Sequence, residues 1–238
     1  MSDWDAKRFW TDADVGREDG GFTVLLDGKP VRTPAKAPLI VPSEHMARAV
    51  AAEWQAQDDK IRPDTMPFTR SANSAIDRVR IQFDDVVEIV ADHGDSDLLC
   101  YRAETPQGLV ERQNAAWDPL LMWSADVLGA RLEPRVGVIH MPQAPADLAK
   151  LRHRVETFDP FQLTAFHDLV SLSGSLVIGF AVCLRLETAA NLWDVSRIDE
   201  LWQREQWGAD EEADHHAKIK QAAFLHADDF FRSCKPDS

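Results

Sequence analysis

Alternating apolar residues predict a β-hairpin near the N-terminus. Residues 22–33 read FTVLLDGKPVRT, with Asp27-Gly28 between β-forming side chains. Because Asp-Gly supplies the positive φ angles of a tight two-residue turn, we expect a strand on each side of it. The run Leu39–Val41 continues the β pattern and ends at Pro42-Ser43.

Apolar residues then change to helical spacing. Met46, Val50 and Trp54 lie four residues apart, and Ser43 is placed to cap a helix that runs to Trp54. The polar, proline-containing stretch 58–67 predicts a loop, and a further helix is expected over 69–79. The N-terminal part should therefore combine strands with helices.

From Phe83 onward the pattern is mainly helical, with short β-like runs at 98–102 and 136–140. Thr105-Pro106 predicts a helix start, Pro119 a break or kink, and Gly129 the end of the helical segment after that proline. Five successive helices are expected in the rest of the chain: 144–157, 160–172, 174–186, 189–207 and 209–231. The predicted fold class is α+β, with a helical bundle as the C-terminal part.

Composition supports a packed core and narrows the choice of partner. The 238 residues are 45% hydrophobic and include eight Trp. Forty acidic and 26 basic residues give a net charge of -14, which repels phosphate backbones and anionic lipid surfaces. We therefore expect no nucleic-acid partner, and a basic protein surface would be attracted instead.

Cysteine usage and the N-terminus indicate a bacterial cytoplasmic protein. Cys100, Cys183 and Cys234 are odd in number, far apart and without Cys-x-x-Cys spacing, which favours a reducing compartment. The first ten residues have no apolar stretch typical of a signal peptide. The uncharged run 170–184 is shorter than the ~20 residues of a membrane span, so we expect no membrane insertion.

The sequence contains only weak catalytic and metal-binding patterns. Residues 210–216 concentrate acidic side chains before His215-His216, but adjacent histidines diverge on a helix and the usual i, i+4 His pair is absent. Cys100, with His93 upstream, is better interpreted as a buried strand cysteine than as a nucleophile. We predict no catalytic site, metal or cofactor; the rival hypothesis is a small hydrolase or transferase with an unrecognised acid and His site.

The segment 196–208 has the most distinctive composition in the sequence, with two Trp and five charged residues. Taken as one helix with Val195, it places Ile198, Leu201 and Trp202 on one apolar side. Glu205 falls on that side and would need an internal partner, whereas Glu200 projects roughly opposite and is free to meet another molecule. Trp54 and Trp207 are interpreted mainly as packing residues, and Gly208 as the end of the helix.

Several segments together resemble the assembly chaperone family that binds the alpha subunit of the F-type ATP synthase catalytic head, found in mitochondria and alphaproteobacteria. The matching segments occur in order along almost the whole chain: Arg8-Phe-Trp, Leu26-Asp-Gly-Lys-Pro-Val-Arg-Thr-Pro, Val41-Pro-Ser-Glu, Ala52-Glu-Trp, Asp97-Leu-Leu-Cys-Tyr-Arg, Leu109-Val-Glu-Arg-Gln, Trp117-Asp-Pro, Ser196-Arg-Ile-Asp-Glu and Trp207-Gly. Each segment is weak alone, but their order and spacing are specific.

The resemblance implies a small two-layer α+β domain over 1–80 and an orthogonal helical bundle over 81–238. It also implies a monomeric chaperone without catalysis, which binds the unassembled alpha subunit, prevents its aggregation and promotes assembly of the catalytic hexamer. An exposed subunit interface is an aggregation liability, which agrees with such a role.

The family's acidic residue before Trp-Gly maps onto Glu200, with Asp199 as its neighbour. Leu201 and Trp202 interrupt the family's acidic stretch here, so Glu200 and Glu205 both stay candidates for the binding carboxylate, with Trp207 beside them. Two further residues, Asp97 and Arg102, are expected to pair across the strand or to brace the domain junction.

Overall fold

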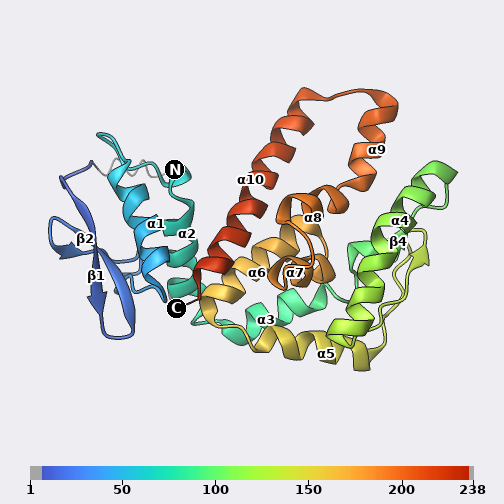
Figure 1. The fold of residues 1–238 in the computed structure, drawn as a ribbon, viewed down its shortest axis with the longest axis horizontal. Helices are drawn as coiled ribbons and strands as arrows, with labels where there is room; N and C mark the ends of the chain where they lie inside the picture. The colour runs from blue at the N-terminus through green and yellow to red at the C-terminus, as the bar shows by residue number, and fades with distance from the viewer. Residues whose placement is uncertain (1–6, 236–238) are drawn as a thin grey trace. The chain divides into compact units, whose positions relative to one another are not determined.

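The computed structural model describes residues 7–235 and divides the chain into two compact units. Of the described residues, unit 1 contains 7–83, 159–165 and 229–235, and unit 2 contains 84–158 and 166–228. A small sheet and many helices give an α+β fold (Figure 1), which confirms the predicted fold class. The domain ranges 1–80 and 81–238 stay a prediction, because a compact unit is not by itself shown to fold alone.

Unit 1 is built around an antiparallel sheet in the order β1-β2-β3, comprising β1 (Ala13–Glu18), β2 (Gly21–Leu26) and β3 (Lys29–Pro30). The turn between β2 and β3 has positive φ at Asp27 (46°) and Gly28 (79°), as a tight hairpin demands. The predicted hairpin is therefore confirmed. The run 39–41 forms no strand; Val41 makes an isolated bridge to Phe22.

In unit 1 helix α1 (Glu44–Gln55) packs on this sheet, and a second helical segment packs on α1 (Figure 1). Helix α1 begins where Ser43 Oγ accepts the Met46 N–H at 3.0 Å, as predicted. Helix α2 (Pro67–Ser74) continues into the π-helical turn η2 (Ala75–Val79), after a loop that contains the 3-10 turn η1 (Pro63–Thr65). The apolar core of the unit includes Val24, Leu26, Leu39, Met46, Val50, Ala72 and Ile76.

Unit 2 is mainly helical, and its core includes Leu99, Trp117, Leu151, Phe166, Leu169, Leu176 and Phe224. The helices after η2 are α3 (Phe83–Asp92), α4 (Gln107–Trp123), α5 (Pro145–Glu156), α6 (Pro160–Ser173), α7 (Leu176–Cys183), α8 (Ala189–Ser196), α9 (Ile198–Trp207) and α10 (Glu211–Ser233). Two short parallel strands, β4 (Tyr101–Arg102) and β5 (Arg135–Val136), overlap the predicted β-like runs only at 101–102 and at 136. Leu98–Cys100 forms the 3-10 turn η3, so the interpretation of Cys100 as a strand cysteine is wrong, although the residue is buried.

An expected helix break and an expected helix length are wrong. Pro119 does not break the helix, because it lies inside α4, which continues to Trp123; the adjacent Trp117 and Leu120 are buried, and this packing offsets the missing N–H. The expected helix 189–207 is two helices, because Arg197 (φ -109°, ψ 15°) leaves the helical conformation between α8 and α9. In residues 7–235 no helix is long and apolar enough to cross a bilayer.

Candidate functional site

Helices α9 and α10 form a helical hairpin in unit 2, and the segment singled out by sequence lies in its first arm. Gly208 (φ 94°, ψ 173°) ends α9, and the carboxylate of Asp210 caps α10 by accepting the Glu212 N–H at 2.9 Å. An ion pair of 3.0 Å between Arg204 and Asp214 joins the two arms. Figure 1 shows the connection between the two arms at the top of the view.

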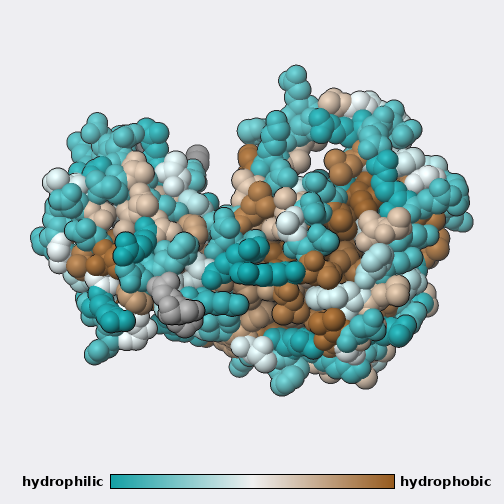
Figure 2. All heavy atoms as spheres, viewed as in Figure 1, coloured by the Kyte–Doolittle hydropathy of each residue, from teal (hydrophilic) through white to brown (hydrophobic). Residues whose placement is uncertain are grey.

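A groove of about 570 Å³ lies between the two arms of this hairpin. Its lining includes Glu200, Leu201, Arg204 and Trp207 of α9 and Asp214 and Lys218 of α10. Figure 2 shows the hollow between α9 and α10, with apolar atoms gathered beside it. The groove therefore combines apolar surface with charges of both signs.

Trp207 is the most exposed Trp in the described chain, with 79% of its surface accessible. The expectation that it mainly packs is therefore wrong. Trp207 is exposed because the helix breaks at Arg197, so α9 does not continue the direction of α8. Ile198 is the only buried residue of α9. Leu201, expected to face the core, is also exposed at 36%.

Glu200 lies on the solvent side of α9, as predicted from helical phase. Its side chain is 50% exposed and accepts from the Arg197 guanidinium at 2.8 Å, one turn away. Arg197 is held in turn over the Trp193 ring, 5.4 Å from its centroid. An exposed ion pair of this kind contributes little to stability, so Glu200 can exchange Arg197 for a cation on another molecule.

Glu205 and Asp199 instead attach α9 to α4. Glu205 is exposed rather than inward-facing, and both its oxygens accept from Arg112, at 2.9 and 2.8 Å; these hydrogen bonds lower the pKa of the Glu205 carboxyl. Asp199 Oδ1 accepts from the side chain of buried Gln113 at 2.6 Å. The expected internal partner of Glu205 is therefore a surface arginine, because α9 packs on α4 along an open side.

Residues of α4 complete this attachment, and sequence reasoning assigned them no role. The Arg112 guanidinium lies 5.0 Å from the centroid of the Trp202 ring. The same ring covers Gly108, where an added Cβ would stand 2.8 Å from the Trp202 ring edge. The motif Leu109-Val-Glu-Arg-Gln carried the signal for Arg112 and Gln113, but their contacts depend on α9, which is distant in sequence.

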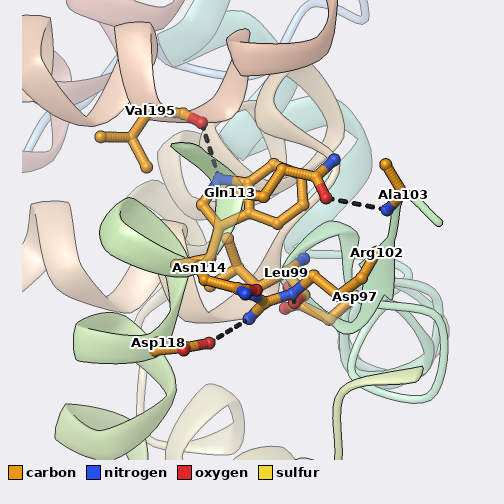
Figure 3. Close-up of polar contacts among 9 residues, drawn as sticks. Asp97, Leu99, Arg102, Ala103, Gln113, Asn114, Asp118 and Val195 are labelled. Atoms are coloured by element: carbon orange, nitrogen blue, oxygen red, sulfur yellow. Dashed lines mark hydrogen bonds and ion pairs between the residues drawn. The ribbon is translucent and has the colours of Figure 1, made fainter. Parts of the chain in front are cut away.

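Asp97 and Arg102 form a buried polar network within unit 2, and they do not pair with each other directly (Figure 3). Asp97 accepts the N–H groups of Leu99 (3.0 Å) and Val177 (3.1 Å). Burial raises the pKa of Asp97 to about 6, against the opposing effect of these hydrogen bonds. The role of this aspartate is to join the chain before β4 to the start of α7.

Arg102 is bound at three points: its guanidinium donates to the Leu99 carbonyl (2.8 Å) and to Asn114 Oδ1 (2.8 Å), and it pairs with Asp118 at 2.9 Å. The expected Asp97–Arg102 pair is replaced by Asp118 because α4 presents Asn114 and Asp118 one turn apart. The guanidinium also lies 5.3 Å from the centroid of the buried Trp117 ring. These contacts make Arg102 a structural residue of unit 2.

Trp54 packs partly, as expected, in unit 1. Its ring meets the buried Trp10 edge-on, with centroids 5.1 Å apart. It also lines a pocket of about 630 Å³. The neighbouring Glu53 accepts the N–H groups of Phe68 and Thr69 at 2.6 and 2.8 Å, and so caps α2.

The described residues offer little for catalysis. Within 7–235, no group of three or more His, Cys, Asp and Glu side chains could hold a metal ion, and His215 and His216 are both exposed. Cys100 is buried, and burial raises the pKa of its thiol to about 12, so it stays protonated and unreactive.

The chain is similar to proteins that carry the same family name, Atp12. Residues 7–125 match the family model described as ATP12 chaperone protein. Among curated proteins, the mitochondrial protein atp12 of Schizosaccharomyces pombe is 26% identical over 222 residues, covering 87% of this chain and 75% of that protein.

Solved structures are more similar still. The crystal structure of Atp12 from Paracoccus denitrificans has a TM-score of 0.94 and 48% identity, covering 98% of this chain and all of that one; an aspartate-to-lysine mutant of the same protein gives the same values. The Atu1473 protein of Agrobacterium tumefaciens has a TM-score of 0.91 and 40% identity, over 96% of this chain and 86% of that one.

Proposed function

Because the chain belongs to the ATP12 chaperone family, whose members are ATP synthase assembly chaperones and not enzymes, we propose that its client is the unassembled alpha subunit of F-type ATP synthase. Binding would prevent aggregation of the alpha subunit until the catalytic hexamer forms, since an unassembled subunit interface exposes apolar surface. The family excludes the rival hypothesis of a hydrolase or transferase. The protein would act as a monomer in the cytoplasm of a bacterium.

The observation that carries this proposal is the exposure of Trp207 beside Glu200 at the groove of the α9–α10 hairpin. An indole that is 79% exposed has no packing role to explain it. Trp is enriched among residues that dominate protein interfaces, because it buries a large surface at a low entropy cost. In the proposed complex Trp207 supplies apolar contact and Glu200 binds a cation of the client.

The other two carboxylates of α9 have supporting parts in this proposal. Asp199 and Glu205 are engaged with Gln113 and Arg112 of α4, and these bonds fix the direction in which α9 presents Glu200. Of the two candidate binding carboxylates, Glu200 is therefore favoured over Glu205. Removing Glu205 would act indirectly, by loosening α9.

Co-expression with the alpha subunit tests the proposal. We expect the wild-type protein to raise the soluble fraction of the alpha subunit and to co-purify with it. Glu200→Lys should reduce both, because it reverses the charge offered to the client, while circular dichroism and melting temperature stay nearly unchanged. Glu200→Gln, which removes the charge and keeps the shape, should give a smaller loss.

The matched control is Glu88→Lys, an exposed glutamate of α3 that makes the same change in net charge away from the groove. It should leave co-purification unaffected. An alpha subunit that stays insoluble with the wild-type protein would refute the choice of client, and equal losses with Glu88→Lys would refute the assignment of Glu200.

Release is proposed to follow from displacement by the beta subunit, which would cover the same surface of the client in the hexamer. Addition of purified beta subunit to the isolated complex should free the protein and leave alpha and beta together. Persistence of the original complex would contradict this step.

A further inference from the structure

A second pocket, of about 630 Å³, lies within unit 1. Its apolar lining consists of Pro34, Trp54, Ile61, Pro63 and Met66. Its cationic lining consists of Arg32, Lys36, Arg70 and Arg78. The volume falls in the range of sites that hold drug-sized ligands or a few residues of a peptide.

One wall of this pocket is a single helical face. Arg70, Asn73, Ser74, Asp77 and Arg78 follow the spacing i, i+3, i+4, i+7 and i+8, which places them in one stripe along α2 and η2. The stripe is polar, and the two arginines lie at its ends. A ligand lying along it would meet a cation at each end.

Another wall of the pocket is the loop after β3, which is held by hydrogen bonds of its own and by one to the helical wall. The Ala35 N–H donates to Asp77 Oδ2 at 3.0 Å, and the Arg32 guanidinium donates to the Lys36 carbonyl at 2.9 Å. A bond of 2.9 Å from the Thr33 N–H to the Ala37 carbonyl closes the loop, in which Lys36 has a left-handed φ of 71°. Binding would therefore cost little conformational entropy in this loop.

The charge of the lining is opposite to that of the whole protein. The lining holds four cations and one carboxylate, that of Asp77, in a chain with a net charge of -14. The Glu53 carboxylate, outside the lining, also interacts electrostatically with Arg70. Among residues 7–235 none of the four cations forms an ion pair, although none is buried. Unpaired cations around an apolar floor are complementary to carboxylates that alternate with apolar side chains.

We propose that this pocket binds an acidic, apolar segment of a polypeptide, with its carboxylates on Arg32, Lys36, Arg70 and Arg78 and an apolar side chain against Trp54. The proposal rests on the proposed function only in taking the ligand to be part of a client protein. It gives the chaperone a second contact of opposite charge to the acidic α9, and confines that contact to unit 1.

A synthetic peptide titrated into the full-length protein tests the inference. The probe is an acetylated, amidated peptide that alternates Glu with Leu and Phe, followed by the indole ¹⁵N–H resonance of Trp54, which Trp54→Phe identifies. We expect a saturable shift of that resonance. The double variant Arg70→Glu with Arg78→Glu should weaken binding at least about tenfold, since two charges of the ligand lose their partners.

The matched control is Arg62→Glu with Arg80→Glu, two exposed arginines of unit 1 that do not line the pocket. It makes the same change in net charge and should bind the peptide with less than about threefold loss, as expected for charges outside the site. Circular dichroism of both variants verifies folding. Equal losses in the two double variants, or no shift of the Trp54 resonance, would overturn the inference.

Two further probes identify the kind of ligand. A peptide with Gln in place of Glu should not bind, and neither should inorganic phosphate at concentrations where the acidic peptide saturates the pocket. Binding of phosphate with equal affinity would show a small-anion site and overturn the peptide assignment. Solubility of the co-expressed alpha subunit is measured separately, so failure of peptide binding leaves the proposed client testable on its own.

Discussion

Asp97 is a fully buried carboxylate whose two oxygens each accept a backbone N–H, one from Leu99 and one from Val177. Two acceptors are needed there, and a carboxyl supplies both. The side-chain amide of an asparagine has one acceptor oxygen and one NH₂ donor. Its NH₂ group would therefore face a backbone N–H, and neither donor would have an acceptor. The residue is therefore required for its two acceptor oxygens rather than for its charge, because burial disfavours the ionised form.

We expect Asp97→Asn to lower the free energy of unfolding by about 1–3 kcal/mol, the cost of a buried donor left without an acceptor. Urea unfolding followed by circular dichroism measures this change. Asp92→Asn, at an exposed position at the end of α3, is the control and should cost less. A variant as stable as the wild type would contradict the two hydrogen bonds that Asp97 accepts.

The same residue gives the protein a defined pH dependence. Burial raises the pKa of Asp97 to about 6, whereas the carboxyl ionises near 3.8 in the unfolded chain. Its contribution to stability is therefore complete below pH 3.8 and is lost as pH rises through 6. Between pH 5 and 7 the wild type should lose about 1 kcal/mol relative to Asp97→Asn, measured by urea unfolding of both proteins. A difference that grows with pH would show the opposite shift.

At the scale of elements, α9 is a short helix that depends on α4. Only Ile198 of α9 is buried, and the break at Arg197 separates it from α8. The Trp202 ring on Gly108, the Arg112–Glu205 pair and the Gln113–Asp199 bond join it to α4 instead. The direction of the proposed client-binding helix is thus set by side chains from another part of the chain.

A pair of substitutions measures this dependence. Replacing Gly by Ala inside a helix usually stabilises by about 0.5–1 kcal/mol, but a Cβ on Gly108 would stand 2.8 Å from the Trp202 ring. Gly108→Ala should therefore give no gain in the wild type and should increase amide exchange in α9. In a Trp202→Leu background the usual gain should return. Additive effects of the two substitutions would contradict the contact.

The effect of Trp207→Ala should be confined to the end of α9. The side chain is exposed, so the free energy of unfolding should change by less than about 0.5 kcal/mol. Co-purification of the alpha subunit should nevertheless fall. A large loss of stability would show that Trp207 packs in solution, as its sequence context indicates.

The elements that could be predicted are those determined by a few neighbouring residues, such as a turn dipeptide or a helix cap. Asp27-Gly28 fixes the hairpin turn, Ser43 caps α1, and Gly129 (φ 74°) ends the helical segment after α4. β1 escaped prediction because its sequence ADVGRE is polar and only half-buried, and pairing with β2 makes it a strand.

The candidate site was predictable only in part for the same reason. Helical phase placed Glu200 on the solvent side correctly, since that depends on α9 alone. The partners of Asp199 and Glu205 could not be predicted, because Gln113 and Arg112 come from α4. Exposure of Leu201 and Trp207 also depends on the break at Arg197, for which the sequence has neither Pro nor Gly.

For the whole molecule, the net charge of -14 concerns association rather than fold. α9 and the first turn of α10 contribute to it through Asp199, Glu200, Glu205, Glu211 and Glu212. An acidic surface speeds encounter with a basic one, and salt screens this attraction within about 10 Å at 0.1 M. Binding of the proposed client should therefore depend on ionic strength.

We expect the association rate constant with purified alpha subunit to fall about tenfold between low salt and about 0.5 M NaCl, measured by stopped-flow fluorescence. The dissociation rate should change much less. Trp207→Ala should have the reverse signature, with faster dissociation and an unchanged salt dependence. A rate constant insensitive to salt would show that net charge does not guide the encounter.

The contact between Gly108 and the Trp202 ring has a consequence for how this protein can evolve. A side chain at position 108 and an indole at position 202 exclude each other, so neither site can drift alone without disturbing the helix proposed to meet the client. Relatives that carry a larger residue at the first position should carry a smaller one at the second. Positions 108 and 202 would then change together among relatives, although they lie far apart in the sequence.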